Sequence, residues 1–147
     1  MEVYSVIMRT NYGNWAGEPM SAAASGVSAL ADRFFSALEG NDAAAVVSCY
    51  APDATIWHNF DQVKMTPAEN AASLRDYFTR FPVRTYKEVR RGYLADDGLV
   101  QQHVLHLVCL DGRHFDWPGC IVLRVRNEKI QLLEEYVDLS SFLQRMS

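Results

Sequence analysis

The second half of the chain contains four strand-like segments separated by turn residues, and no other feature limits the possible folds as much. The segments are VRTYKEVRRGYLA, LVQQHVLHLVCL, RHFDWPGCIVLRVR and KIQLLEEYVDL. Asp96-Asp97-Gly98, Asp111-Gly112 and Asn127-Glu128 lie between them. Asp-Gly between two apolar runs is a strong signal for a β-hairpin. The sequence therefore predicts a four-stranded antiparallel meander.

The residues before the meander indicate two helices followed by a strand. Over residues 27–38 apolar side chains recur at spacings of three and four, which predicts an amphipathic helix that ends at Gly40-Asn41. Asp42 is a suitable N-cap for a second, shorter helix, which we expect Pro52 to end. The segment ATIWHNF then reads as a strand, because it contains residues that favour strands.

A third helix and a short C-terminal helix complete the pattern. The segment TPAE, Thr66–Glu69, combines an N-cap threonine, a proline at the first helical position and a glutamate at N3. This helix is expected to stop before Pro82, and Ser140 or Ser141 starts the C-terminal helix. The order predicts an α+β fold, with three N-terminal helices covering one face of a curved mixed or antiparallel sheet.

The composition fits one globular domain with an N-terminal extension. A chain of 147 residues is long enough for one core, and 49% hydrophobic with 22% charged residues is an ordinary balance for a globular protein. Residues 1–21 are rich in Gly, Asn, Pro and Tyr and show no clear period. We therefore expect an extension there and a single domain over residues 22–147.

Charge and hydropathy argue against several classes of partner. The net charge is −4 and no basic cluster occurs, so nucleic acid is not an expected partner. No apolar stretch approaches the roughly 20 residues that span a bilayer, and the N-terminus does not resemble a secretory signal. The three cysteines, Cys49, Cys109 and Cys120, are far apart. They read as reduced, buried thiols of a cytoplasmic protein.

The sequence predicts neither a metal site nor a cofactor. His103 and His106 are three residues apart on a strand, so their side chains point apart, and no other His or Cys pair has zinc-type spacing. The chain contains no Gly-rich phosphate loop and no nucleophile elbow. Acid–base chemistry without a cofactor is the enzyme class that these observations leave.

Two segments resemble a known family. With FFSALEGNDAAAVVSCYAPDATIWHNF near the start and KIQLLEEYVDLSSFL near the end, residues 26–145 resemble the SnoaL-like family of the nuclear transport factor 2-like superfamily. Ketosteroid isomerase, limonene epoxide hydrolase and scytalone dehydratase belong to the same superfamily. The resemblance implies a cone, in which a bent sheet wraps around an apolar pocket that helices cover, and it suggests a homodimer. It does not decide the activity, because one fold hosts many functions.

Strand parity predicts which side chains face the interior of this cone. On the third strand of the meander one side carries Phe115, Trp117, Gly119, Ile121, Leu123 and Val125, and the other carries His114, Asp116, Arg124 and Arg126. The first set is expected inside. Hydrophobicity alone does not decide between His103 and His106, or between Glu134 and Glu135. Matching the family places Val104 and His106 inside, together with Leu133, Glu135 and Val137. Gln101, Gln102 and His103 are then expected outside.

The resemblance to ketosteroid isomerase covers only part of that enzyme's machinery. The position of its proton-abstracting base matches His58, and a histidine could serve there. The positions of its two hydrogen-bond donors match Phe34 and Ile121, which cannot donate. Without an oxyanion hole the mechanism loses its largest contribution. Steroid isomerisation by that route is therefore not expected.

The resemblance to limonene epoxide hydrolase is also partial. Asn59 matches the water-binding asparagine, and Glu135 matches one of the two acids. Trp57 replaces the tyrosine, His106 the second acid, and Val104 the bridging arginine. A His106–Glu135 pair could still deprotonate water or a substrate, because the carboxylate would orient the imidazole and raise its pKa.

These observations lead to one preferred function and two alternatives. The preferred one is a cofactor-independent isomerase, hydratase, dehydratase, epoxide hydrolase or cyclase acting on a small apolar oxygenated molecule, with His58, His106 and Glu135 moving protons. The substrate-binding candidates are Phe34, Phe35, Trp57, Asn59, Val104, Phe115, Trp117, Ile121, Leu133 and Val137. The alternatives are a non-catalytic binding module and a structural dimer filled by its own aromatic side chains. In either alternative His58 is a wall residue, and Asn59 forms a hydrogen bond at a strand end.

Overall fold

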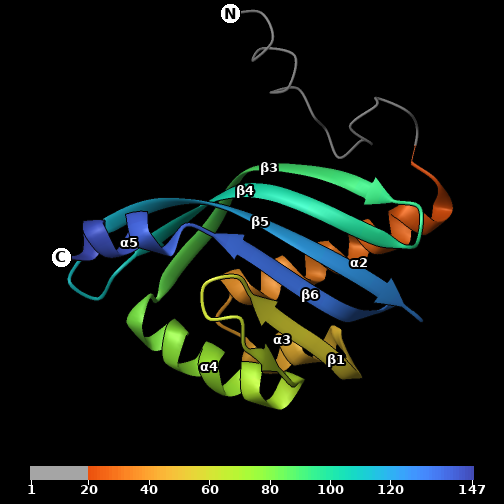
Figure 1. The fold of residues 1–147 in the computed structure, drawn as a ribbon, viewed down its shortest axis with the longest axis horizontal. Coiled ribbons are helices and arrows are strands. Elements are labelled where there is room, and N and C mark those ends of the chain that lie inside the picture. Colours follow the sequence, from red (N-terminus) through yellow and green to blue (C-terminus); the bar gives the residue numbers. More distant parts are fainter. Residues whose placement is uncertain (1–19) are drawn as a thin grey trace, which may run out of the picture.

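The computed structural model describes residues 20–147, which form one curved six-stranded sheet with helices packed on it (Figure 1). The α+β class predicted from the sequence is confirmed. Residues 1–19 lie outside the described part, so the N-terminal extension and the domain boundary at residue 22 stay predictions. No helix in residues 20–147 is long and apolar enough to cross a bilayer.

The helices within the described residues follow the predicted order. They are α2 (Ala22–Glu39), α3 (Ala43–Ser48), α4 (Pro67–Arg80) and α5 (Leu139–Met146). Helix α2 begins earlier than the apolar period does. Its first turn is exposed and rich in Ala, which favours a helix without creating an apolar face.

The predicted helix caps of α3 and α4 are present. The Asp42 side chain accepts from the backbone of Ala45, and Thr66 with Glu69 forms a complete capping box. Two boundary predictions are wrong. Helix α3 ends at Ser48, and Pro52 lies inside a strand where the ladder is irregular, a position that proline tolerates. Helix α5 is capped by Asp138 and begins at Leu139, before both of the predicted serines.

The strands form the sheet in the order β2-β1-β6-β5-β4-β3. Their bounds are β1 Tyr50–His58, β2 Lys64–Met65, β3 Val83–Leu94, β4 Gly98–Val108, β5 His114–Arg126 and β6 Lys129–Val137. The four-stranded antiparallel meander is confirmed as β3 to β6. Strand β1 joins it in parallel with β6, and β2, which the sequence analysis did not predict, pairs antiparallel with β1.

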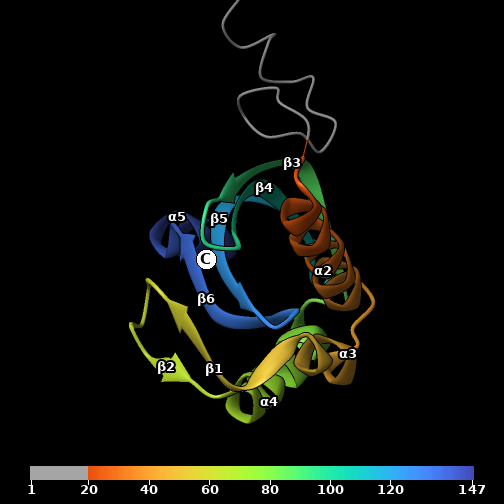
Figure 2. The ribbon, with the colours of Figure 1, turned by 90° about the vertical axis from the view of Figure 1, so that its right-hand side faces the viewer.

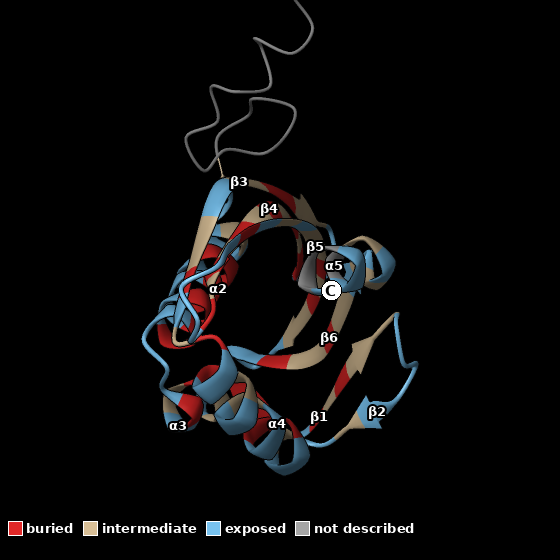
Figure 3. Ribbon diagram, turned by 90° about the vertical axis from the view of Figure 1, so that its left-hand side faces the viewer, coloured by how far each residue is buried: buried red, intermediate tan, exposed pale blue. Residues whose placement is uncertain are grey.

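The sheet curls around its helices, as the cone prediction requires. Figure 2 shows the sheet bending from β1 round to β3, with α2 facing its concave side and α3 and α4 beside β1. The apolar face of α2 is buried against it, and consists of Val27, Leu30, Ala31, Phe34, Phe35 and Leu38. Figure 3 shows that buried residues occur on α2 and on the strands of the sheet that α2 faces.

Strand β5 has the predicted parity, whereas β4 has the opposite one. Gln101, His103, Leu105 and Leu107 are buried, and they pair with the inward residues of β5. Residues that pair directly across two strands share a face, so Val104 and His106 point outward. The prediction for β4 was therefore wrong, and the inward histidine is His103.

Candidate functional site

One row of paired residues crosses the concave face and collects most of its polar side chains. His58 of β1 pairs with Glu135 of β6, and Glu135 pairs with Ile121 of β5. Ile121 pairs with Gln101 of β4, which pairs with Arg91 of β3. Because paired residues share a face, the sheet register alone brings these side chains, distant in sequence, to the same side.

Within this row, His58 and Glu135 form a close pair of an imidazole and a carboxylate. His58 Nε2 lies 3.3 Å from Glu135 Oε2, and the side chains are 15% and 22% exposed. The carboxylate is thus largely removed from water and still accessible. The sequence analysis predicted both residues for proton transfer, but it paired Glu135 with His106 rather than with His58.

The surroundings of Glu135 make its carboxyl group a better proton acceptor than usual. Burial raises the pKa of Glu135, and the nearby His58 opposes this rise without cancelling it. Burial also raises the pKa of Tyr50, Tyr77 and Tyr86, and the charge of Glu135 adds to the rise in all three. The carboxyl group is therefore surrounded by protonated tyrosines in an interior of low polarity.

The contacts of His58 indicate which ring nitrogen carries its proton. Its Nδ1 atom is buried without a hydrogen-bond partner among the described residues, and its ring stacks on Phe60 at a centroid distance of 5.2 Å. In the neutral ring, a proton on Nε2 lies on the side of the Glu135 carboxylate, 3.3 Å away, and leaves only an acceptor unpaired at Nδ1. A proton on Nδ1 would instead leave a buried donor without an acceptor. We therefore assign the Nε2–H tautomer.

The predicted apolar lining is divided between two buried clusters. Phe34, Phe35, Ile121 and Leu133 belong to the main cluster, on the same side as His58 and Glu135. Phe115 belongs to a second cluster, against which Trp117 packs. Val137 points inward next to Gly119. The positions of these seven side chains agree with the prediction that they face inward, and their binding of a substrate stays a prediction.

Three other candidates do not reach the interior through their side chains. Val104 points outward on β4, and Trp57 lies between the inward residues of β1, its ring packing edge-on against Tyr136 at 5.5 Å. Both were predicted to bind substrate inside the cone, and the alternation of strand side chains explains the correction. Asn59 donates to Val137 O and accepts from Val137 N, which extends the pairing of β1 with β6.

His106 belongs to a separate polar cluster on the outer face. Its Nδ1 atom lies 2.8 Å from Asp116 Oδ1, and its Nε2 atom lies 3.2 Å from His114 Nδ1. The sheet separates this cluster from Glu135, so the predicted His106–Glu135 pair does not form. Within residues 20–147 no group of three His, Cys, Asp or Glu side chains is arranged to hold a metal ion.

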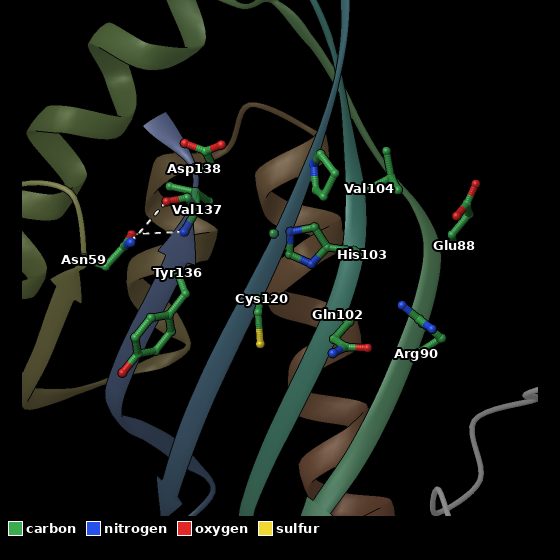
Figure 4. Close-up of a pocket in the computed structure, with 12 residues that line it drawn as sticks. Asn59, Glu88, Arg90, Gln102, His103, Val104, Cys120, Tyr136, Val137 and Asp138 are labelled. Atoms are coloured by element: carbon green, nitrogen blue, oxygen red, sulfur yellow. Dashed lines mark hydrogen bonds between the residues drawn. The ribbon is translucent and has the colours of Figure 1, made fainter. Parts of the chain in front are cut away.

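An open concavity of about 470 Å³ lies mainly over the outer face of the sheet (Figure 4). Its lining includes the outward-facing Glu88, Arg90, Gln102, Val104, Cys120 and Tyr136, and also His103, Gly119 and Val137 of the inner face. Neither His58 nor Glu135 lines this concavity, so it does not correspond to the apolar interior pocket that the resemblance implies. That interior pocket stays a prediction.

The sequence analysis missed His103 and Gln101 as interior residues. His103 is 4% exposed and Gln101 is fully buried. A signal that could have found them was present. The parity of β5 was predictable, and a short Asp-Gly turn before it limits the register of β4, which in turn determines which face His103 occupies.

Comparison with known proteins agrees with this fold. A profile of the SnoaL-like domain matches residues 31–133, which is more than half of the chain. The chain belongs to the SnoaL-like family. No curated protein matches the sequence of this SnoaL-like protein significantly.

Solved structures with the same fold come from several bacteria. A protein of Xanthomonas campestris proposed to be a polyketide cyclase is 16% identical, with a TM-score of 0.77 over 86% of this chain and 100% of its own. A nuclear transport factor 2-like protein of unknown function from Burkholderia pseudomallei is 16% identical, with a TM-score of 0.72 over 85% and 97%. An LEH-like epoxide hydrolase of M. tuberculosis is 18% identical, with a TM-score of 0.68 over 82% and 88%. At these identities the SnoaL-like protein shares their fold, and its activity needs separate evidence.

Proposed function

We propose that this SnoaL-like protein is a cofactor-independent acid–base enzyme that acts on a small apolar oxygenated molecule. Glu135 exchanges a proton with the substrate, and His58 orients the carboxylate. The observation that carries this proposal is the 3.3 Å contact between His58 Nε2 and Glu135 Oε2, in a largely buried yet accessible position. Two comparisons support an enzyme. The chain belongs to the SnoaL-like family, and structures with the same fold include proteins named as a polyketide cyclase and an epoxide hydrolase.

The pair suits removal of a proton from carbon next to a carbonyl group. Burial raises the pKa of Glu135, which makes the carboxylate a stronger base than an exposed glutamate. His58 Nε2 contacts one carboxylate oxygen, Oε2, at 3.3 Å, and the described residues form no hydrogen bond to the other. Once protonated, Glu135 returns the proton to another atom of the substrate, which completes an isomerisation, a dehydration or a cyclisation.

Attack by water on an epoxide is the less favoured chemistry for this site. Asn59 matches the asparagine that helps to hold water in limonene epoxide hydrolase. Here both ends of its amide bond the backbone of Val137, at 3.1 and 3.0 Å. An amide held in this way is not free to orient a water molecule. The second acid of limonene epoxide hydrolase is replaced here by His106. His106 points outward, so it does not help to hold a water molecule beside Glu135 either.

Hydrogen–deuterium exchange at carbon tests this proposal without knowledge of the product. A panel of aryl and alicyclic ketones would be incubated in D₂O, and enzyme-dependent exchange next to the carbonyl followed by NMR. We expect Glu135→Gln to lower the exchange rate by about 10²–10⁴-fold. His58→Asn should lower it less, because the base remains.

A matched control uses a histidine on the other face. His106→Asn makes the same change as His58→Asn but on the outer side of the sheet, and exchange should stay at the wild-type rate. Wild-type exchange in Glu135→Gln, or equal loss in both histidine variants, would contradict the proposal. Ligand binding without any exchange would instead indicate a non-catalytic binding module.

We propose further that a second copy of the chain covers the outer face of the sheet. Trp57, Val104 and Tyr136 form an apolar group there, and 43% of Tyr136 is exposed to solvent. Partly exposed aromatic side chains on a sheet face are common at homodimer interfaces.

A further inference from the structure

A chain of buried polar contacts runs from α2 to His103. Asp32 Oδ1 lies 2.6 Å from Nη1 of Arg91, whose side chain is only 4% exposed. Arg91 Nε donates to Gln101 Oε1 at 2.8 Å, and the Gln101 amide nitrogen lies 3.2 Å from His103 Nδ1. Each member is thus oriented by the one before it.

This order of contacts determines the tautomer of His103. A guanidinium group only donates hydrogen bonds, so the Gln101 amide must present its oxygen to Arg91. Its NH₂ group then faces His103, and Nδ1 must accept. A neutral imidazole that accepts through Nδ1 carries its proton on Nε2.

The same contacts keep the ring neutral. Protonation of Nδ1 would place an N–H directly against the NH₂ group of Gln101, which Arg91 prevents from turning. Burial, which disfavours the charged form, lowers the pKa of His103 from 6.5 to about 4. At neutral pH His103 is therefore an uncharged hydrogen-bond donor.

The donor atom lies over the space left by a glycine. A Cβ atom built on Gly119 would lie 3.0 Å from His103 Nε2 and 3.4 Å from Val137. Figure 4 shows the His103 ring extending from β4 toward β5. Among the described residues His103 makes no hydrogen bond through Nε2. His103, Gly119 and Val137 all border the open concavity, so a ligand or solvent oxygen that enters there completes the hydrogen bond of this N–H.

This donor lies one row of paired residues away from the proposed base, on the same face of the sheet and two strands away. His103, Gly119 and Val137 form the row of paired residues next to the row that contains Glu135. Two neighbouring rows on one face are separated by about 7 Å along the strands. That separation fits a molecule whose oxygen contacts one row while its reacting carbon contacts the next.

We propose that His103 Nε2–H donates a hydrogen bond to the carbonyl or enolate oxygen of the ligand whose carbon exchanges a proton with Glu135. This inference rests on the proposed function. It supplies the oxyanion donor that Phe34 and Ile121 cannot provide. A neutral donor held in advance stabilises the developing negative charge without first having to reorient.

The first test measures the tautomer in the free protein, where no substrate is needed. Imidazole ¹⁵N shifts should identify His103 as neutral and protonated on Nε2 from about pH 5.5 to 8. Gln101→Glu replaces the amide donor by an acceptor, so Nδ1 should gain a proton. Gln102→Glu, which makes the same charge change on the outer side of β4, should leave His103 unchanged. A proton on Nδ1 in the wild type, or an unaltered His103 in Gln101→Glu, would overturn the inference.

The second test measures recognition of oxygen with a matched pair of probes, acetonaphthone and ethylnaphthalene. We expect the ketone to bind about three- to tenfold more tightly, the effect of one hydrogen bond. His103→Phe should remove this preference, and so should Gly119→Ala, whose methyl group would crowd Nε2. Circular dichroism and thermal unfolding would verify that both variants fold. A preference that survives in both folded variants, or no binding of either probe, would overturn the inference.

The two proposals can fail separately. If carbon exchange depends on Glu135 but not on His103, the proposed function stands and this inference is wrong. If the ketone preference depends on His103 while Glu135→Gln exchanges normally, the oxygen site stands and the proposed base is wrong.

Discussion

Single residues carry unusual acid–base properties because of where the sheet places them. His103 is the clearest example, since its pKa of about 4 lies below the ordinary value of 6.5. The unfolded chain therefore binds a proton that the folded protein rejects. This contribution to stability is complete above about pH 6.5 and is lost as the pH falls toward 4.

We expect the free energy of unfolding of the wild type to fall by about 2–3 kcal/mol more than that of His103→Gln between pH 7 and pH 4.5. Glutamine is neutral at both values and can still accept from Gln101. Urea unfolding at the two pH values provides the measurement, with the exposed His114→Gln as a control that follows the wild type. Parallel pH profiles for wild type and His103→Gln would contradict this expectation.

Glu135 should change stability in the opposite direction. Its pKa is raised in the folded state, so folding favours the protonated carboxyl group. The associated stability is present below the ordinary pKa of about 4.5 and is lost as the pH rises through the folded value.

Glu135→Gln should therefore become more stable relative to the wild type as the pH increases from 4.5 to 8. Glutamine cannot ionise, and the variant avoids placing a charge in the interior. Thermal unfolding across this range measures the difference, and Glu134→Gln on the outer side of β6 is the matched control. A constant difference between wild type and Glu135→Gln would contradict the raised pKa.

At the scale of helices and strands, one buried arginine connects the ends of two helices. Arg84 of β3 donates to the carbonyl oxygen of Leu38 at the end of α2 and to Asn41 Oδ1 at 2.6 Å. It also donates to the Phe81 carbonyl at the end of α4, at 2.6 Å, and lies over the Phe78 ring. One carbonyl oxygen at the C-terminal end of each helix thus accepts a hydrogen bond from this guanidinium group.

Arg84→Met should lower the free energy of unfolding by about 2–4 kcal/mol, because it removes several buried charge-assisted hydrogen bonds at once. Arg80→Met provides the control. Its ion pair with Asp76 is exposed on α4, so its loss should cost less than about 0.5 kcal/mol. Equilibrium urea unfolding measures both. Equal effects of the two substitutions would show that Arg84 does not connect the helices.

At the scale of the whole molecule, the proposed dimer uses the outer face of the sheet. We expect the wild type to sediment as a dimer at micromolar concentration, and Tyr136→Lys to shift it toward the monomer. Leu110→Lys, in the exposed β4–β5 turn, alters another apolar surface residue and should leave the dimer intact. Analytical ultracentrifugation measures the three proteins. A wild-type monomer at all concentrations would exclude the proposed arrangement.

Local sequence was sufficient to predict the elements that local chemistry determines. Gly112 has a positive φ in the predicted β4–β5 turn, and Asn127 and Glu128 have positive φ in the β5–β6 turn. The capping box at Thr66 and the alternation along β5 were also correct. In each case a few neighbouring residues contain the whole physical signal.

The residues of β4 taken alone do not reveal which face is buried; that follows only when the strand is paired with β5 across the turn. Leu105 and Leu107 alternate with Val104 and Val108, so both faces of the strand look apolar. Its polar residues give no contrast either, because the buried Gln101 is hydrogen-bonded by an arginine that lies ten residues earlier and on another strand, and His103 in turn contacts Gln101. The matching to relatives then placed the wrong histidine inside.

The sequence by itself determined the order of helices and strands, the turns between them, and the family. These depend on side-chain spacing and on backbone conformations that few residue types adopt. Only the tertiary structure decided that Glu135 contacts His58, and that His103 faces inward beside it. Both outcomes follow from sheet register, which is the sum of many distant pairings and is not encoded by any short segment.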